Sequence, residues 1–75
     1  MDRLMHLRHL EEADSHIALG ERLIAQQERR LADLAQHGHD TTIAKKLLWN
    51  FLNTQEEVRG HRERILKHLK EVPEA

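Results

Sequence analysis

The sequence has no cysteine and no tyrosine, and only one tryptophan, one phenylalanine, one proline and three glycines in 75 residues. Without cysteine there are no disulfides, no thiolate chemistry and no cysteine-based zinc sites. An excess of charge of one sign is also missing, because 12 lysines and arginines are balanced by 13 aspartates and glutamates. This balance gives no overall positive field to attract nucleic acid or an anionic membrane. We therefore expect neither as a partner.

Long hydrophobic runs are absent as well. Asp2, Arg3, His6, Arg8 and His9 interrupt the beginning of the chain. No continuous signal-peptide or membrane-spanning segment can form there, so the expected location is the cytoplasm.

The sequence also lacks the patterns of a catalytic site. It has no phosphate-binding glycine loop and no recognisable pair of nucleophile and base. The adjacent carboxylates Glu11-Glu12 and Glu56-Glu57 point in different directions on a helix, so they do not form acid–base pairs. We expect a protein that is not an enzyme and has no cofactor.

Apolar residues recur at spacings of three and four on both sides of a short central segment, which is the period of an α-helix. In residues 2–36, successive a and d positions of a heptad repeat hold Leu10, Ala13, Ile17, Gly20, Ile24, Gln27, Leu31 and Leu34. In residues 41–72 the same spacing connects Ala44, Leu47, Phe51, Thr54, Val58, His61, Ile65, His68 and Val72, and Pro73 ends the pattern. The sequence predicts an all-α fold in which residues 1–75 form one αα-hairpin of two long antiparallel helices.

Residues 37–40 are predicted to form the turn between the helices. Gly38 can adopt the left-handed conformation that ends a helix. Asp40 or Thr41 can cap the next helix by accepting hydrogen bonds from its free backbone N–H groups.

Folding at this turn predicts which residues meet across the seam, the line of contact between the two helices. The expected pairs are Leu34 with Ala44, Leu31 with Leu47, Gln27 with Phe51, Gly20 with Val58 and Ala13 with Ile65. Gly20 weakens a helix by about 1 kcal/mol relative to alanine, so it either admits a bulky side chain or marks a weak point. Gln27 would be a buried polar group.

A second set of apolar residues falls outside the predicted seam. These residues are Leu19, Leu23, Leu48, Trp49 and Leu52. Monomers rarely expose so much contiguous apolar surface, and a chain this short has little core of its own. We predict a non-enzymatic structural or interaction module that dimerises through these residues into a four-helix bundle, with an unidentified protein partner also possible. The alternative is that Leu23 and Leu48 merely widen the core stripe.

Seven histidines in so short a chain are unusual. The predicted register places His9 opposite His68 and His16 opposite His61, where Glu12 or a dimer mate could add ligands for zinc, copper or nickel. Within each helix, however, these histidines are seven residues apart, and no ligand set is complete in one chain. We therefore predict no metal site, and a metal- or pH-responsive protein remains the alternative function.

Three short segments carry a resemblance to known proteins. They are the His-x-x-x-Gly-Glu element at residues 16–21, the Gly-His-Asp-Thr turn at residues 38–41, and the helix with Leu47-Leu48, Phe51 and Thr54-Gln55. Between His16 and Leu66 the chain resembles a group of short helical-hairpin proteins of rhizobia and related alphaproteobacteria. The resemblance implies a helix, a turn and a second helix. It implies no activity, because that group has no assigned function.

Overall fold

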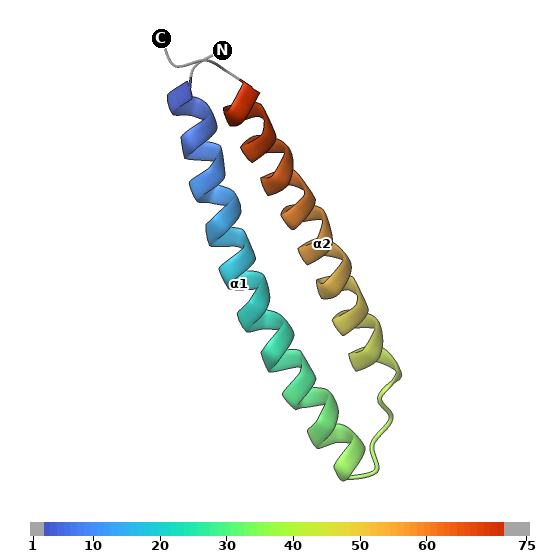
Figure 1. Ribbon diagram of the computed structural model, residues 1–75. Coiled ribbons are helices and arrows are strands. Elements are labelled where there is room, and N and C mark those ends of the chain that lie inside the picture. Colours follow the sequence, from blue (N-terminus) through green and yellow to red (C-terminus); the bar gives the residue numbers. More distant parts are fainter. Residues whose placement is uncertain (1–2, 72–75) are drawn as a thin grey trace.

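The computed structural model describes residues 3–71, which form two long helices packed side by side (Figure 1). Helix α1 spans Arg3–Gln36 and helix α2 spans Thr42–Glu71, and they run in opposite directions. This confirms the predicted αα-hairpin, with α2 beginning one residue later than expected. The predicted helix ends at Asp2 and at residues 72–73 lie outside the described residues.

Helix α1 ends at a left-handed glycine. Gly38 has a φ of 72°. Its N–H donates to the carbonyl of Ala35 at 3.2 Å, and the N–H of His39 donates to the carbonyl of Leu34 at 2.9 Å. This pair of bonds is the Schellman motif, which satisfies carbonyls that the end of a helix leaves free. The predicted role of Gly38 is confirmed.

Asp40 caps the start of α2. Its Oδ1 accepts the backbone N–H of Thr42 at 3.0 Å and the hydroxyl of Thr42 at 2.7 Å. The carbonyl of Thr41 accepts the N–H of Lys45 at 2.9 Å, the first hydrogen bond of helical spacing. Asp40 therefore supplies the side-chain cap, and Thr41 supplies the backbone start of the helix.

The buried side of α1 repeats every seven residues. His6, Ala13 and Gln27 are buried, and Gly20 and Leu34 are half-buried. This confirms the predicted contact positions and the burial of Gln27. The prediction missed His6, which lies one heptad before Ala13.

The buried side of α2 agrees with the prediction at five of its described contact positions. Ala44 and Ile65 are buried, and Phe51, Val58 and His68 are half-buried, as predicted. Three positions were predicted one residue too early: Leu47, Thr54 and His61 are exposed, whereas Leu48, Gln55 and Arg62 are buried or half-buried. The face of α2 that contacts α1 is therefore rotated slightly about the helix axis relative to the predicted face.

Two buried glutamines explain this rotation. A Cβ at Gly20 would lie 2.8 Å from the Cδ of Gln55, so the glycine makes room for the glutamine. Gln55 Nε2 donates to the carbonyl of Ile17 at 2.9 Å. Gln27 makes the reverse connection, because its Nε2 donates to the carbonyl of Ala44 at 3.1 Å. A glutamine of each helix thus donates a hydrogen bond to the backbone of the other helix. These two bonds fix the rotation of both helices about their own axes.

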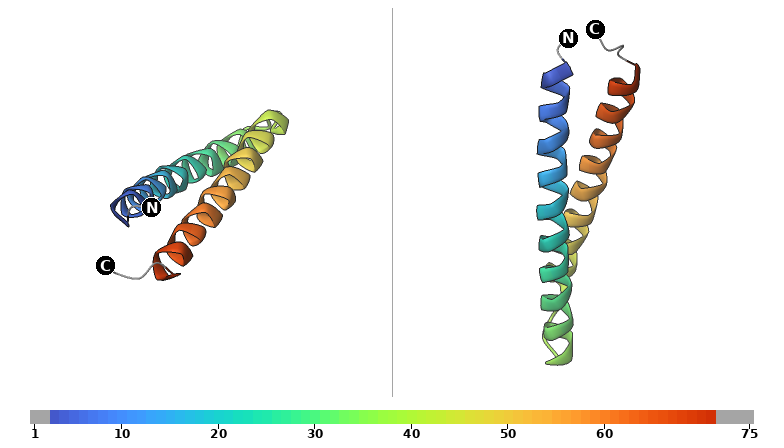
Figure 2. Two further views of the ribbon diagram at one scale, coloured as in Figure 1. Left: turned by 90° about the horizontal axis from the view of Figure 1, so that it is seen from above. Right: turned by 60° about the vertical axis from the view of Figure 1, so that its left-hand side comes forward.

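The helices are also offset along their axes relative to the prediction. Gln27 reaches Ala44, which was expected to face Leu34. Gln55, in place of Val58, fills the space at Gly20. Figure 1 shows the reason, since the connecting segment leaves the end of α1 and runs back beside it before α2 begins. Both views in Figure 2 show helices that are close near the turn and diverge toward the termini.

The hairpin is a rod with principal extents of 61 × 14 × 13 Å. Its Cα radius of gyration is 17.2 Å. A compact chain of this length would have a radius of about 11 Å. Within residues 3–71 no large side chain is completely buried, and the buried apolar residues are Ala13, Ala44 and Ile65. One seam between two helices therefore does not make a closed core.

Candidate interaction surface

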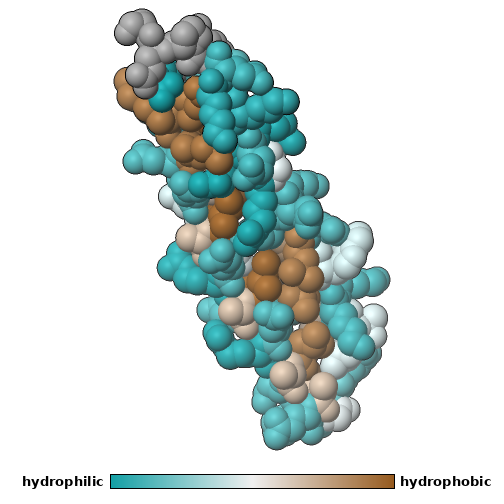
Figure 3. All heavy atoms as spheres, in the orientation of Figure 1, coloured by the Kyte–Doolittle hydropathy of each residue, from teal (hydrophilic) through white to brown (hydrophobic). Residues whose placement is uncertain are grey.

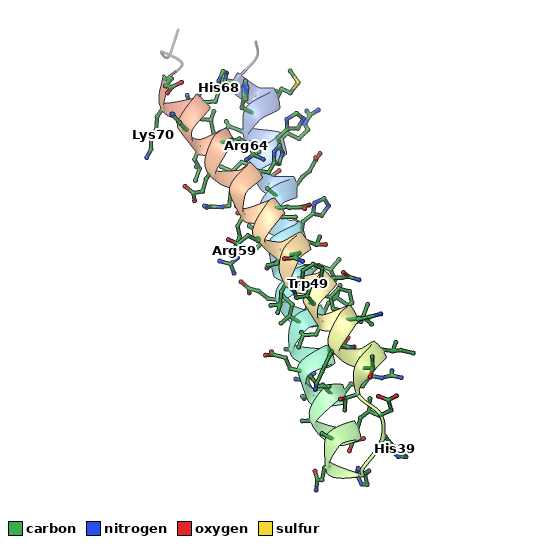
Figure 4. The ribbon with its side chains drawn as sticks, turned by 90° about the vertical axis from the view of Figure 1, so that its right-hand side faces the viewer. His39, Trp49, Arg59, Arg64, His68 and Lys70 are labelled. Atoms are coloured by element: carbon green, nitrogen blue, oxygen red, sulfur yellow. The ribbon has the colours of Figure 1, made fainter. Side chains whose placement is uncertain are left out.

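The two sides of the seam differ in what crosses them. On one side, which we call the paired flank, Asp14 and Glu21 of α1 lie beside Arg62 and Arg59 of α2. Arg62 Nε is 2.6 Å from Asp14 Oδ1, and Arg59 Nη2 is 3.3 Å from Glu21 Oε1. Figure 4 shows Arg59 at this edge of α2. Ion pairs this exposed contribute only about 0.2–1 kcal/mol each, but their side chains bridge the helices. A hollow of about 440 Å³ on this flank is lined mainly by charged side chains, among them Asp14, Arg59 and Arg62.

On the opposite side, which we call the open flank, a groove runs between the helices. Its volume is about 220 Å³. It is lined by His16, Leu19, Gly20, Leu23, Phe51, Thr54, Gln55 and Val58. Gln55 Nε2 already donates a hydrogen bond to the carbonyl of Ile17. The groove therefore offers a mainly apolar surface. We call it the apolar groove.

A second groove continues the open flank toward the termini. Its volume is about 380 Å³. It is lined by His9, Glu12, Ala13, His16, Glu57, Val58 and His61. His16 and Val58 line both grooves, so the two adjoin. The structure therefore brings His9, His16 and His61 together around what we call the histidine groove.

The fourth candidate histidine lies elsewhere. His68 stacks against His6 with ring centroids 4.3 Å apart, and not against His9 as predicted. The offset between the helices is the cause, because it moves α2 along α1 by close to one turn. His6 is only 7% exposed, and the Nε2 of His68 is buried without a hydrogen-bond partner. Extending the heptad repeat backward from Ala13 would have identified His6.

Three histidines around one groove do not form a metal site by themselves. Among residues 3–71, no three histidine, aspartate or glutamate side chains are placed to hold one ion. The arrangement gathers groups that can take up protons, and two carboxylates, along one surface.

The five residues predicted to form the dimer interface, a Leu19/Leu23 surface and a Leu48/Trp49/Leu52 surface, lie at different places around the hairpin. Leu19 is 47% exposed and, with the half-buried Leu23, lines the apolar groove. Leu48 is half-buried in the seam. Leu52 is 48% exposed and lies seven residues before Arg59, which places it on the paired flank. Trp49, 65% exposed, lies on the outside of α2 (Figure 4). Leu52 follows it by three residues and is therefore its neighbour on the helix surface.

Apolar residues also form a broken stripe between polar edges on the face seen in Figure 3, with a patch at the N-terminal end of α1. Leu4 and Leu7 are 58% and 42% exposed there. Over the part of the chain that the structure describes, neither helix has an apolar stretch long enough to span a bilayer.

Comparisons with protein-family models, with curated proteins and with solved structures found no match. The resemblance to the alphaproteobacterial hairpin proteins therefore stays a prediction.

Proposed function

We propose that this protein is a non-enzymatic interaction module that acts by pairing with a second copy to form a four-helix bundle. The observation that carries the proposal is the incomplete core of the single hairpin. Large apolar side chains with 41–81% exposure are Leu4, Met5, Leu7, Leu19, Ile43, Leu47, Trp49 and Leu52. A helix with apolar residues around much of its circumference, as in the first turns of α2, needs neighbours on more than one side.

The accessible surface supports the same proposal. The hairpin exposes 6086 Å². A compact monomer of this mass would expose about 4,800 Å². The excess of roughly 1,300 Å² is larger than the area of about 800 Å² that each partner contributes to an ordinary stable interface. A second hairpin could therefore cover the excess without any change of fold.

Sedimentation equilibrium near neutral pH tests the proposal. We expect a species of twice the chain mass of 8.9 kDa. The apparent mass should fall on dilution, because association follows mass action. A strict monomer at the highest attainable concentration would contradict the proposal.

The histidine groove favours a second candidate function, in which the protein responds to protons or metal. Zinc titration followed by calorimetry distinguishes the metal form of this candidate. Near-stoichiometric zinc uptake with measurable heat would support the metal form. No zinc uptake would leave only the form of this candidate in which the histidines respond to protons.

A further inference from the structure

The two flanks offer different surfaces to a second copy. The paired flank is crossed by the Asp14–Arg62 and Glu21–Arg59 ion pairs, and its hollow is lined mainly by charged side chains. The open flank is hollowed at the apolar groove, where Leu19 projects with 47% of its surface exposed. A projecting leucine beside an apolar hollow is self-complementary, because two copies related by a twofold axis can each insert this side chain into the other.

We propose that the second copy docks on the open flank, and that protonation of the adjoining histidine groove releases it. This inference rests on the proposed function, since it names the face and the regulation of the same association. The docking surface would centre on the apolar groove, with the histidine groove at its border.

The charges around the histidine groove set the direction of the response. The groove that holds His9, His16 and His61 is also lined by Glu12 from α1 and Glu57 from α2. Histidine is the side chain whose charge ordinarily changes between about pH 5 and pH 8. Full protonation adds three positive charges to a border that holds two carboxylates, so the border becomes positive.

The orientation of the second copy decides whether this charge becomes repulsion. If the two hairpins lie with the same ends together, the histidine grooves meet each other, and juxtaposed like charges at an interface weaken association. If they lie head to tail about the apolar groove, the histidines approach a border where Arg30 follows Leu23 by seven residues and Asp33 follows Leu19 by fourteen. Those two charges oppose each other, so release by protons is proposed for the arrangement with the same ends together.

Three measurements by sedimentation equilibrium test the proposal. From about pH 7.5 to about pH 5.5 we expect the dimer dissociation constant to rise at least about tenfold. The combined variant His9→Gln, His16→Gln and His61→Gln should remove most of this rise. His39→Gln, at an exposed position in the turn, should keep it. A dimer equally stable at both pH values, or one whose pH response survives the triple substitution, would overturn the proposal.

A permanent positive charge at position 16 distinguishes charge repulsion between the two copies from acid unfolding of the hairpin. His16→Lys should weaken the dimer near neutral pH at least about tenfold relative to His16→Gln, with equal helicity by circular dichroism. Equal dissociation constants for the two variants would count against the proposal.

Two matched leucines identify the face. Leu19→Asp, on the open flank, should abolish the dimer, whereas Leu52→Asp, on the paired flank and almost equally exposed, should keep it. The reverse result would place the second copy on the paired flank and overturn the inference while supporting the proposed function. If the wild-type protein were instead a monomer near neutral pH, the proposed function itself would be contradicted.

Discussion

Gln27 and Gln55 are buried polar side chains whose hydrogen bonds link the two helices. Each is 7% exposed, and each donates to a backbone carbonyl of the opposite helix. A buried amide without a partner would cost about 1–3 kcal/mol, so helix rotations that break these bonds are disfavoured. Large apolar residues, which apart from the buried Ile65 are at most half-buried among residues 3–71, specify rotation much less strictly. The glutamines therefore set the alignment, and the apolar residues supply general attraction.

Gly20 and Gln55 should be energetically coupled. Gly20→Ala places a Cβ against the side chain of Gln55 and should displace its bond to Ile17. We expect a net destabilisation of about 1 kcal/mol or more in urea unfolding, despite the higher helix propensity of alanine. In a Gln55→Ala background, the same substitution should stabilise by about 0.5–1 kcal/mol. Additive effects of the two substitutions would show that they do not share this contact.

The positive φ of Gly38 should matter more than the space around it. No atom lies within 4 Å of a Cβ built at Gly38, so only the backbone conformation opposes a side chain. Gly38→Ala should destabilise by about 1 kcal/mol, and Gly38→Val by more, in unfolding measurements at fixed protein concentration. Gly60→Ala is the matched control, because Gly60 lies within α2 and its added methyl group meets only Arg64 at an ordinary distance. That substitution should stabilise the protein, and a similar loss at both glycines would contradict the assigned cap.

At the scale of the helices, Asp40 links the start of α2 to pH. The hydrogen bond from the backbone N–H of Thr42, followed by the one from the Thr42 hydroxyl, holds the pKa of Asp40 below its usual value. A lowered folded-state pKa means that the stabilisation is fully present above the unfolded pKa of about 3.9. It is lost as the pH falls through the lower folded value.

Two substitutions at Asp40 separate the charge from the hydrogen bond. Asp40→Ala should lower the melting temperature by a few °C near neutral pH, and its difference from wild type should shrink in strong acid. Asp40→Asn retains an oxygen acceptor and should keep more of the stability, but without the contribution of Asp40 to the dependence on pH in the acid range. Thermal unfolding followed by circular dichroism over this range measures both effects. A constant gap between wild type and Asp40→Ala down to strong acid would show that the carboxylate charge is not involved.

The helices themselves could be predicted because their signals are local. The three- and four-residue spacing, the left-handed glycine and the capping aspartate act within a few residues, and the two helix ends that meet at the turn, Gln36 and Thr42, follow them closely. The rotation and offset of α2 depend on non-local contacts. Whether Thr54 or Gln55 faces α1 is decided by the space above Gly20, since both positions are close to the seam in a helix of 3.6 residues per turn.

The candidate site was only partly predictable for the same reason. Counting from the turn placed His16 near His61, and both histidines line one groove. The same count put His68 against His9, because it did not include the connecting segment that runs back along α1. The apolar residues outside the seam could be recognised from the sequence. Their division between two flanks could not, because it follows from the position of the α2 seam.

For the whole molecule, the single tryptophan reports which flank is covered. Trp49 is 65% exposed on the outside of α2, near Leu52 and away from the apolar groove. If the second copy docks on the open flank, the indole remains in contact with water in the dimer. Quenching of the tryptophan fluorescence by the neutral quencher acrylamide should then be nearly equal at concentrations below and above the dimer dissociation constant. Docking through the paired flank would bury an aromatic anchor, the kind of residue that commonly dominates interface energetics, and quenching would fall as the dimer forms.

Parallel measurements of Leu52→Asp and Leu19→Asp at the higher concentration provide the reference states. We expect equal quenching in both variants, because neither the monomer nor the open-flank dimer covers Trp49, and a protected indole in Leu19→Asp alone would reverse the assignment of the two flanks.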